Sequence, residues 1–140
     1  MLSCLPSTSC TPASAAYVDE FHRRATEQAR KLVGDDYEIV MVNDGSPDDS
    51  LQRAVELHRV DPHVVVVDLS RNFGHHKALM TGLAYSRGAQ VFLIDSDLEE
   101  QPEWLAEFHD KLQKTGADSV YGVQASRRGG AVERLTGQWF

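Results

Sequence analysis

Two aspartates, Asp95 and Asp97, follow the apolar run Val91–Ile94 in the stretch VFLIDSDLEEQP. Such a run is typical of a strand buried on both faces. Carboxylates at i and i+2 on an extended segment leaving that strand point the same way, and hard cations prefer oxygen ligands completed by phosphate oxygens. The spacing favours a Mg²⁺ or Mn²⁺ site with Asp97 and Asp95 as metal ligands. The alternative is an acidic turn before the next helix, which Glu99 and Glu100 fit.

A second polar stretch, NDGSPDDS, follows the run Tyr37–Val42. Ser46 and Asp49 match a capping box with a proline at the first helical position, so this part is interpreted as a helix start. Asp44 lies between the strand and this cap, and neither needs it. A carboxylate there could accept hydrogen bonds from a ribose or a base edge. Ligand binding and a role in the turn both remain open for Asp44.

These residues belong to a pattern in which strands and helices alternate. An amphipathic helix is predicted from Ala16 to the stop at Gly34, and helical spacing recurs around Leu51–His58, Ala78–Tyr85 and Trp104–Leu112, with Trp104 and Phe108 expected in the core. The predicted strands are Tyr37–Val42, Val64–Leu69, Ala89–Ile94 and Ser119–Val123. The order β-α-β-α-β-α-β predicts a doubly wound α/β domain with a mostly parallel sheet, in which ligands bind beyond the carboxyl ends of the strands.

Length and charge limit the remaining possibilities. The 140 residues suit one domain, and the formal net charge of −7 argues against a nucleic-acid partner. No apolar run approaches the roughly 20 residues that cross a bilayer. Residues 1–15 are interpreted as an irregular or poorly ordered lead-in, and residues 16–140 as the functional domain. Cys4 and Cys10 fit no common zinc spacing and are interpreted as free thiols of a reducing cytosol.

Four motifs in order resemble family 2 glycosyltransferases, the inverting enzymes of the GT-A fold. They are VNDGSPDDS, LSRNFGHHKALMTGLAYSRG, VFLIDSDLEEQPEWL and YGVQASRRGG, and the similarity covers about Tyr37–Phe140. The subgroup it resembles includes dolichyl-phosphate mannose synthase and the bactoprenol glucosyl transferases. The resemblance implies a nucleotide-diphospho-sugar transferase fold, a Rossmann-like mostly parallel sheet flanked by helices, here incomplete at both ends.

The resemblance also implies roles for individual residues. Asp97 would coordinate the cation, Asp95 would lie near the ribose, and Arg127 would meet phosphate, so that Asp97 and Arg127 are the catalytic candidates. The expected nucleotide-sugar-binding residues are Asp44, Gly45, Ser46, Arg71, Asn72, Gly74, Asp95, Ser96 and Asp97.

The implied activity is metal-dependent transfer of a sugar, with inversion, from a UDP- or GDP-linked donor to a polyprenyl phosphate or glycan acceptor. The implied enzyme is cytoplasmic, and a full-length member would work at the cytoplasmic face of a membrane. Two alternatives stay open. The chain could be a non-catalytic or inactive fragment of such an enzyme, or an aspartate-based phosphotransfer enzyme, because a D-x-D after a strand also suits that chemistry.

The two ends of the chain depart from the family pattern. Family members begin with a hydrophobic strand, whereas this chain begins MLSCLPSTSCTPAS, in which only LSCL could imitate that strand and Pro6 would cut it short. Relatives also continue beyond RLTGQWF to acceptor-binding elements and membrane helices. The expectation is therefore a donor-binding fragment whose membrane contact is made only through parts missing from this chain.

Overall fold

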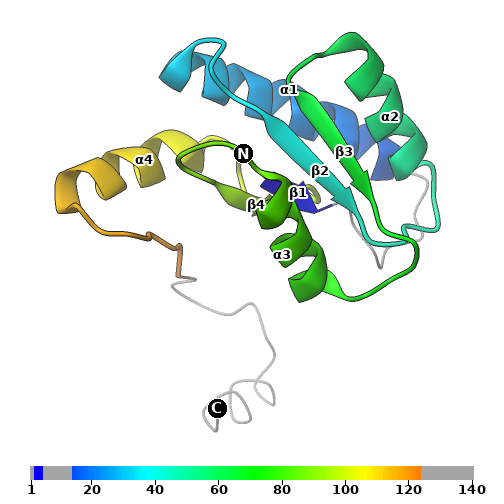
Figure 1. Cartoon of the computed structure of the whole chain (residues 1–140). Helices are drawn as coiled ribbons and strands as arrows, with labels where there is room; N and C mark the ends of the chain where they lie inside the picture. The colour runs from blue at the N-terminus through cyan, green and yellow to red at the C-terminus, as the bar shows by residue number, and fades with distance from the viewer. Residues whose placement is uncertain (1, 5–13, 124–140) are drawn as a thin grey trace, which may run out of the picture. The chain divides into compact units, whose positions relative to one another are not determined.

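The computed structural model describes residues 2–4 and 14–123 of the chain. The chain divides into two compact units, Met1–Glu107 and Phe108–Phe140. The first unit holds a four-stranded sheet with helices on both faces, and it contains every predicted site residue except Arg127 (Figure 1). Arg127 lies outside the described residues.

The sheet consists of strands β1 (Leu2–Cys4), β2 (Ile39–Asn43), β3 (Val64–Asp68) and β4 (Leu93–Asp95) in the order β3-β2-β1-β4. Every pairing is parallel. The chain moves outward from β1 to β3 and then returns across β1 to β4, so the strand order reverses between β1 and β4. This is the doubly wound arrangement that the sequence predicts. In such folds ligands bind beyond the carboxyl ends of the two strands at which the strand order reverses.

Helices α1 (Ser14–Val33) and α2 (Ser50–Val60) cover one face of the sheet, and α3 (His75–Tyr85) covers the other. The strand β2 shows why both faces must be covered, because all five of its residues are buried. Ile39 and Met41 pack with α1 and α2, whereas Val40 and Val42 pack with Ala78 of α3. Side chains alternate across a strand, so a continuous apolar run needs a helix layer on each side.

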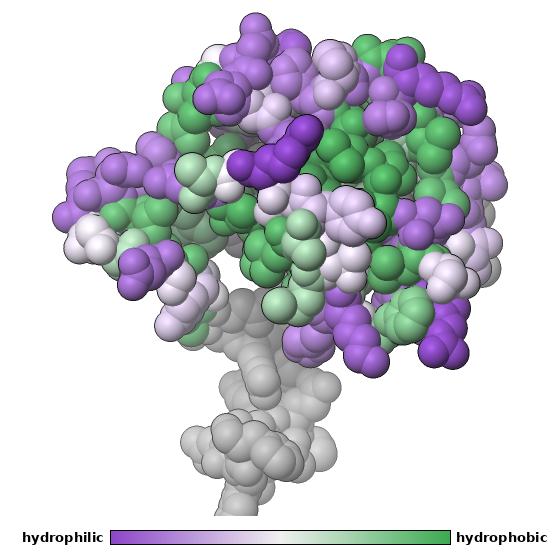
Figure 2. Space-filling view, viewed as in Figure 1, coloured by the Kyte–Doolittle hydropathy of each residue, from purple (hydrophilic) through white to green (hydrophobic). Residues whose placement is uncertain are grey.

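The view in Figure 2 is taken from the α3 side of the sheet. Apolar surface stays visible on this side of the molecule (Figure 2). Val65, Leu69 and Leu83, which pack against the core cluster on the α3 side, are only half-buried. Among the described residues no helix has the length and apolar character that crossing a membrane requires.

The start of the chain differs from the prediction. Leu2–Cys4 forms the inner strand β1 within the stretch expected to be an irregular lead-in, and α1 begins at Ser14 instead of Ala16. The short strand has partners on both sides, since Leu2 lies opposite both Val40 and Leu93. Two ladders of backbone hydrogen bonds therefore stabilise a segment that has no periodic signal of its own.

Two predicted strands also differ. The strand β4 begins at Leu93, four residues later than expected, because the three residues of β1 offer it a ladder of only three pairs. The segment Ser119–Val123 has no strand structure, and Tyr121 and Val123 are 78% and 84% exposed. A β-branched run forms a strand only where a neighbouring backbone and a core receive it, and this segment has neither among the described residues.

Helix α4 (Trp104–Thr115) forms near the predicted place, but the expectation that Trp104 and Phe108 lie in the core is wrong. Trp104 is 39% exposed, and no residue of α4 is buried. Helical spacing of apolar residues predicts an amphipathic face, and burial of that face requires a partner surface.

Candidate functional site

The last residue of β4 is Asp95, which lies opposite Cys4 at the end of β1. The D-x-D motif therefore begins at the carboxyl ends of the two strands between which the strand order reverses. The side chain of Asp95 is 42% exposed, Ser96 is buried and Asp97 is exposed. Asp95 thus lies at the end of its strand, and the role of Asp95 and Asp97 as ligands stays a prediction.

A tight turn follows the motif. The Asp97 Oδ1 accepts a hydrogen bond from the Glu99 backbone amide at 2.9 Å, and Leu98 between them has a positive φ of 63°. Glu100 does not serve the next helix as expected, because its carboxylate lies 3.3 Å from the backbone nitrogen of Asp95, which donates to it. The turn thus gathers carboxylates around the end of β4.

The electrostatics of Asp95 reflect this crowding. Partial burial raises the pKa of Asp95, and the carboxylates of Asp97 and Glu99 raise it further. His75 opposes the shift, since its Nδ1 lies 3.7 Å from the Asp95 Oδ1. The charged form of Asp95 is therefore less favourable here than in water, and a cation near the carboxylates would relieve the repulsion.

The residues fit a divalent cation that takes only part of its ligands from protein. Carboxylate oxygens are the ligands that Mg²⁺ and Mn²⁺ prefer. The described residues contain no cluster of three or more His, Cys, Asp or Glu side chains able to hold a metal. Mg²⁺ in nucleotide sites is bound through one or two carboxylates plus substrate phosphates and water, which matches the pair Asp95 and Asp97.

The loop Arg71–Gly74 connects β3 to α3 and lies beside the end of β2. The Asp44 carboxylate accepts hydrogen bonds from the backbone amides of Phe73, at 2.7 Å, and Gly74, at 2.8 Å. The guanidinium of Arg71 stacks over the Phe73 ring, 4.8 Å from its centre. The structure therefore joins two of the predicted nucleotide-binding segments through one buried carboxylate.

The turn after β2 differs from the predicted capping box. Helix α2 begins at Ser50 with Asp49 as its N-cap residue, and the cap predicted at Ser46 is wrong. The Ser46 amide donates to the Asn43 side chain at 3.1 Å, while the amide group of Asn43 donates to Asp68 at 2.8 Å. The turn is thus anchored to the ends of β2 and β3, which delays the helix by one turn.

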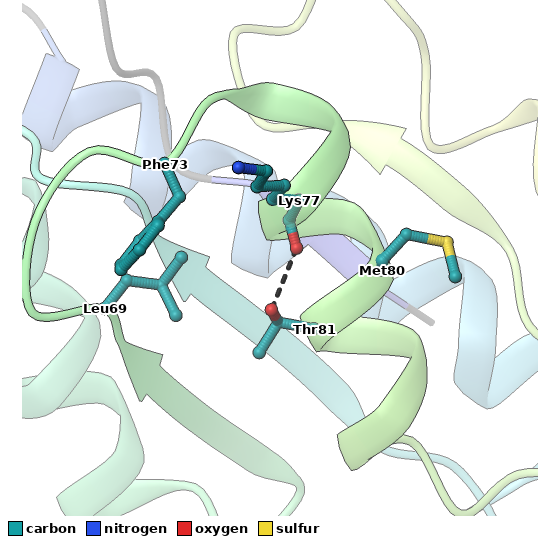
Figure 3. Close-up of a pocket in the computed structure, with 5 residues that line it drawn as sticks. All are labelled: Leu69, Phe73, Lys77, Met80 and Thr81. Carbon is teal, nitrogen blue, oxygen red and sulfur yellow. Dashed lines mark hydrogen bonds between the residues drawn. The ribbon is translucent and has the colours of Figure 1, made fainter.

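A separate apolar hollow of about 470 Å³ lies between α3 and the loop before it (Figure 3). Its lining residues are Leu69, Phe73, Lys77, Met80 and Thr81. The hydroxyl of Thr81 donates to the backbone oxygen of Lys77 at 2.8 Å and does not extend into a polar site. None of the described residues that line the hollow is a carboxylate, so it is distinct from the D-x-D motif.

Comparison with known proteins decides the family. The profile described as "Glycosyl transferase family 2" matches residues 11–139. The chain belongs to glycosyl transferase family 2. The match includes the D-x-D motif, the Arg71–Gly74 loop and the Asp44 turn, so all three are parts of a family 2 domain. It also includes Arg127, whose predicted role remains a prediction.

Curated relatives within the family share substantial identity. A protein of Mycobacterium tuberculosis described as "Putative glycosyltransferases" is 59% identical over 117 residues, 84% of this chain and 34% of that protein. The undecaprenyl-phosphate 4-deoxy-4-formamido-L-arabinose transferase of Pseudomonas syringae is 41% identical over 114 residues, 79% of this chain and 33% of that protein. The chain therefore spans about a third of the length of these relatives.

The fold is similar to that of two solved structures. The crystal structure of S. aureus TarS 1–349 superposes with a TM-score of 0.51 at 24% identity, covering 93% of this chain and 38% of that one. A second TarS 1–349 structure, in complex with UDP, also gives a TM-score of 0.51, at 21% identity. At this identity the likeness establishes the α/β fold, in agreement with the sheet described above.

Sequence reasoning missed two features of the site. His75 is not among the predicted site residues, and its place beside Asp95 follows from the crossover that carries α3 across β1. The link between Asp44 and the loop joins residues 29 and 30 positions apart. A polar residue at a strand end with no local partner was the one available signal for that link.

Proposed function

We propose that this chain is the donor-binding part of an inverting glycosyltransferase that takes a UDP- or GDP-linked sugar and transfers it to a lipid phosphate or a glycan. The observation that carries the proposal is the place of Asp95. It ends β4 beside β1 at the reversal of strand order, with Asp97 two residues later, in a family 2 domain. Ligands of doubly wound sheets bind at this point.

The donor nucleotide would contact three segments that meet at the carboxyl ends of the strands. Asp95, Ser96 and Asp97 would lie under the ribose and diphosphate. The exposed Arg71 and Asn72, with Gly74 at the start of α3, would line the nucleoside side. Asp44, Gly45 and Ser46 belong to the same proposed pocket at the end of β2. A TarS structure with a similar fold contains UDP, which supports a nucleoside diphosphate as the ligand class.

Asp97 and Asp95 would hold a Mg²⁺ or Mn²⁺ ion. When bound, such an ion supplies electrostatic stabilisation of the negative charge that grows on the leaving diphosphate. Exposure of Asp97 leaves its carboxylate accessible, and the repulsion around Asp95 favours a nearby cation. The Arg71 guanidinium could donate hydrogen bonds to phosphate oxygens, for which its planar fork is well suited.

A polyprenyl phosphate is the acceptor that the relatives favour. The Pseudomonas syringae relative is an undecaprenyl-phosphate transferase by its description. A phosphate acceptor is already anionic and attacks the anomeric carbon without a strong general base, whereas a hydroxyl acceptor would need one. Arg127, outside the described residues, is the residue proposed to hold that phosphate. A full-length enzyme of this kind would act at the cytoplasmic face of a membrane.

The deciding experiment is calorimetric titration of the chain with UDP and with GDP, each with and without Mn²⁺. We expect binding of one nucleotide that requires Mn²⁺ and is abolished by Asp97→Ala. Asp36→Ala is the matched control. Asp36 is an exposed carboxylate just before the amino end of β2, and the D-x-D motif follows the carboxyl end of β4. Circular dichroism of each variant confirms that the fold is retained.

Absence of heat with both nucleotides, from a folded chain, would contradict the proposal and support the alternative of an inactive fragment. Binding that Asp36→Ala and Asp97→Ala weaken equally would show that the D-x-D motif is not the metal site. The phosphotransfer alternative finds no support in the family match. It would return if Asp95 formed a stable adduct with beryllofluoride.

A further inference from the structure

Residues 69–94 differ in charge from the rest of the chain. They include the basic residues Arg71, Lys77 and Arg87 and none of the 21 acidic residues, although the chain has a formal net charge of −7. The segment contains the loop before α3, the helix itself and the connection to β4. The helix that covers this face of the sheet therefore lies in a segment without a single carboxylate side chain.

Large apolar side chains are exposed on the same segment. Met80 on α3 is 65% exposed, and Phe73 in the loop before it is 37% exposed. Both line the apolar hollow of about 470 Å³ between the helix and the loop (Figure 3). Neighbouring apolar side chains that stay exposed mark surfaces that bind another molecule or a membrane.

Basic side chains lie beside these apolar ones. Lys77 lines the hollow and forms no ion pair among the described residues. The guanidinium of Arg71 lies over the ring of Phe73, 4.8 Å from its centre. Arg87 is paired with Glu38 at 3.3 Å and adds less charge to this face. Long basic side chains next to apolar ones suit the boundary between lipid chains and head groups, because their stems are apolar and their ends are charged.

The carboxylates of the chain do not oppose an anionic surface at this face. Asp68, which precedes the segment, accepts a hydrogen bond from Asn43, and Asp95, which follows it, lies beside His75. The acidic residues of α1 and α2 lie on the other face of the sheet. A helix with its side chains is about 10 Å across, which is also the Debye length at about 0.1 M salt. Charges beyond α3 and the sheet are therefore largely screened.

We propose that the exposed side of α3 and of the loop before it binds the surface of a membrane that contains anionic lipids. Phe73 and Met80 would enter the boundary of the acyl chains, and the amine of Lys77 would meet lipid phosphates. Apolar burial and attraction of basic residues are the two contributions that hold a peripheral protein on a bilayer. A bilayer is favoured over a protein partner because Met80 projects away from the hollow, and fluid acyl chains surround such a side chain without a matching pocket (Figure 3).

Binding through this face would also bring the membrane close to the candidate site. His75 is the first residue of α3, and its Nδ1 lies 3.7 Å from the Oδ1 of Asp95. A bilayer along α3 would therefore lie near the D-x-D motif, where the lipid phosphate of the proposed function would have to arrive. Membrane contact, expected only through parts outside this chain, would then involve the described residues as well. The binding needs no nucleotide, so it can hold where the proposed function fails.

The test is cosedimentation of the full chain with vesicles at about 0.1 M salt. Vesicles of equal parts phosphatidylglycerol and phosphatidylcholine are compared with vesicles of phosphatidylcholine alone. We expect the chain to bind the anionic vesicles and to bind the neutral ones far more weakly. Binding to the anionic vesicles should fall as the salt rises to about 0.5 M, because salt screens the attraction.

Two variants of the proposed surface have matched controls on the opposite face. Lys77→Gln should weaken the affinity for anionic vesicles about fivefold, the contribution of one lysine near such a surface. Met80→Gln keeps the length of the side chain and should weaken it about fivefold or more through lost apolar burial. Lys31→Gln on α1 and Val60→Gln on α2 replace exposed residues of the same kinds and should bind as the wild type does. Circular dichroism confirms that each variant is folded.

Three results would overturn the inference. One is a folded wild-type chain that does not bind the anionic vesicles. Another is a loss of affinity in Lys31→Gln and Val60→Gln equal to that in Lys77→Gln and Met80→Gln, since binding would then not be confined to α3. The third is a dimer, seen by sedimentation velocity without lipid, that Met80→Gln dissociates, because a second copy would then cover this face. A chain that binds vesicles but neither UDP nor GDP would retain this inference and contradict the proposed function.

Discussion

The Nδ1 of His75 lies 3.7 Å from the Oδ1 of Asp95, although the two residues belong to different elements. His75 opens α3 and Asp95 closes β4, so the contact joins the start of the crossover helix to the end of the strand that it leads into. The contact places an imidazole beside the carboxylates of the D-x-D motif, and it opposes the rise in the pKa of Asp95 that burial causes.

Removal of the Asp95 charge should abolish nucleotide binding and make the folded chain more stable. Partial burial, with a contribution from Asp97, raises the pKa of Asp95, so its charged form destabilises the folded chain at neutral pH. We expect Asp95→Asn to abolish Mn²⁺-dependent nucleotide binding and to raise the unfolding free energy by less than about 1 kcal/mol, because solvent screens a half-exposed group. Urea unfolding and titration measure the two effects. A less stable variant would contradict this account, and Asp36→Asn serves as the control.

The sequence was sufficient to predict a strand where its apolar residues form a continuous local run. The continuous apolar runs gave β2 and β3 within two residues of their ends. The same reasoning did not predict β1, because a segment of three residues is too short to show a periodic pattern of apolar residues. Pairing with β2 and β4 on either side stabilises this strand. For Ser119–Val123 a strand was predicted and none forms, because this segment pairs with no strand among the described residues.

The candidate site shows the same division. The D-x-D motif could be located because it directly follows an apolar run that ends at the reversal of strand order. The engagement of Asp44 could not, because hydrogen bonds to residues 29 and 30 positions away leave no local trace. Polar residues that follow a strand thus indicate where the site lies. The path of the chain between strands determines which of these residues meet.

Gly34 offers a test of backbone geometry that is separate from the site. It ends α1 with a φ of +66°, its amide donates to the Arg30 carbonyl at 3.0 Å, and a Cβ there would meet nothing within 4 Å. Gly34→Ala should therefore cost about 1 kcal/mol through the left-handed conformation alone. Gly34→Asn should cost less, because asparagine tolerates that conformation. Urea unfolding compares them, and equal costs would contradict the backbone explanation.

Acid should weaken the fold through Asp61. Burial alone would raise the pKa of Asp61, but hydrogen bonds from the His63 amide and from the imidazoles of His22 and His63 together hold it below the ordinary value. A carboxyl with a lowered folded-state pKa stabilises the chain above its unfolded pKa of about 4, and the contribution is lost as the pH falls further. The unfolding free energy should drop more steeply below about pH 4 in the wild type than in Asp61→Asn.

Urea unfolding at several pH values measures this difference, and Asp36→Asn should retain the wild-type slope because Asp36 is exposed. At pH 6 the Asp61→Asn variant should be less stable by about 1–2 kcal/mol, since partly buried partners lose hydrogen bonds to a charged group. Parallel acid profiles for wild type and Asp61→Asn would show that the two histidines do not hold this carboxyl in the folded chain.

The core beneath α1 provides the largest expected loss of stability. Phe21 is completely buried and packs with Met41 of β2 and Leu57 of α2, so it joins both helices of this face to the sheet. Phe21→Ala should cost about 3–5 kcal/mol through lost burial and a cavity. Val60, at the end of α2, is 79% exposed, and Val60→Ala should change stability by less than about 0.5 kcal/mol. Urea unfolding followed by circular dichroism compares them, and a tolerated Phe21→Ala would mean that α1 does not hold the sheet in the way its packing indicates.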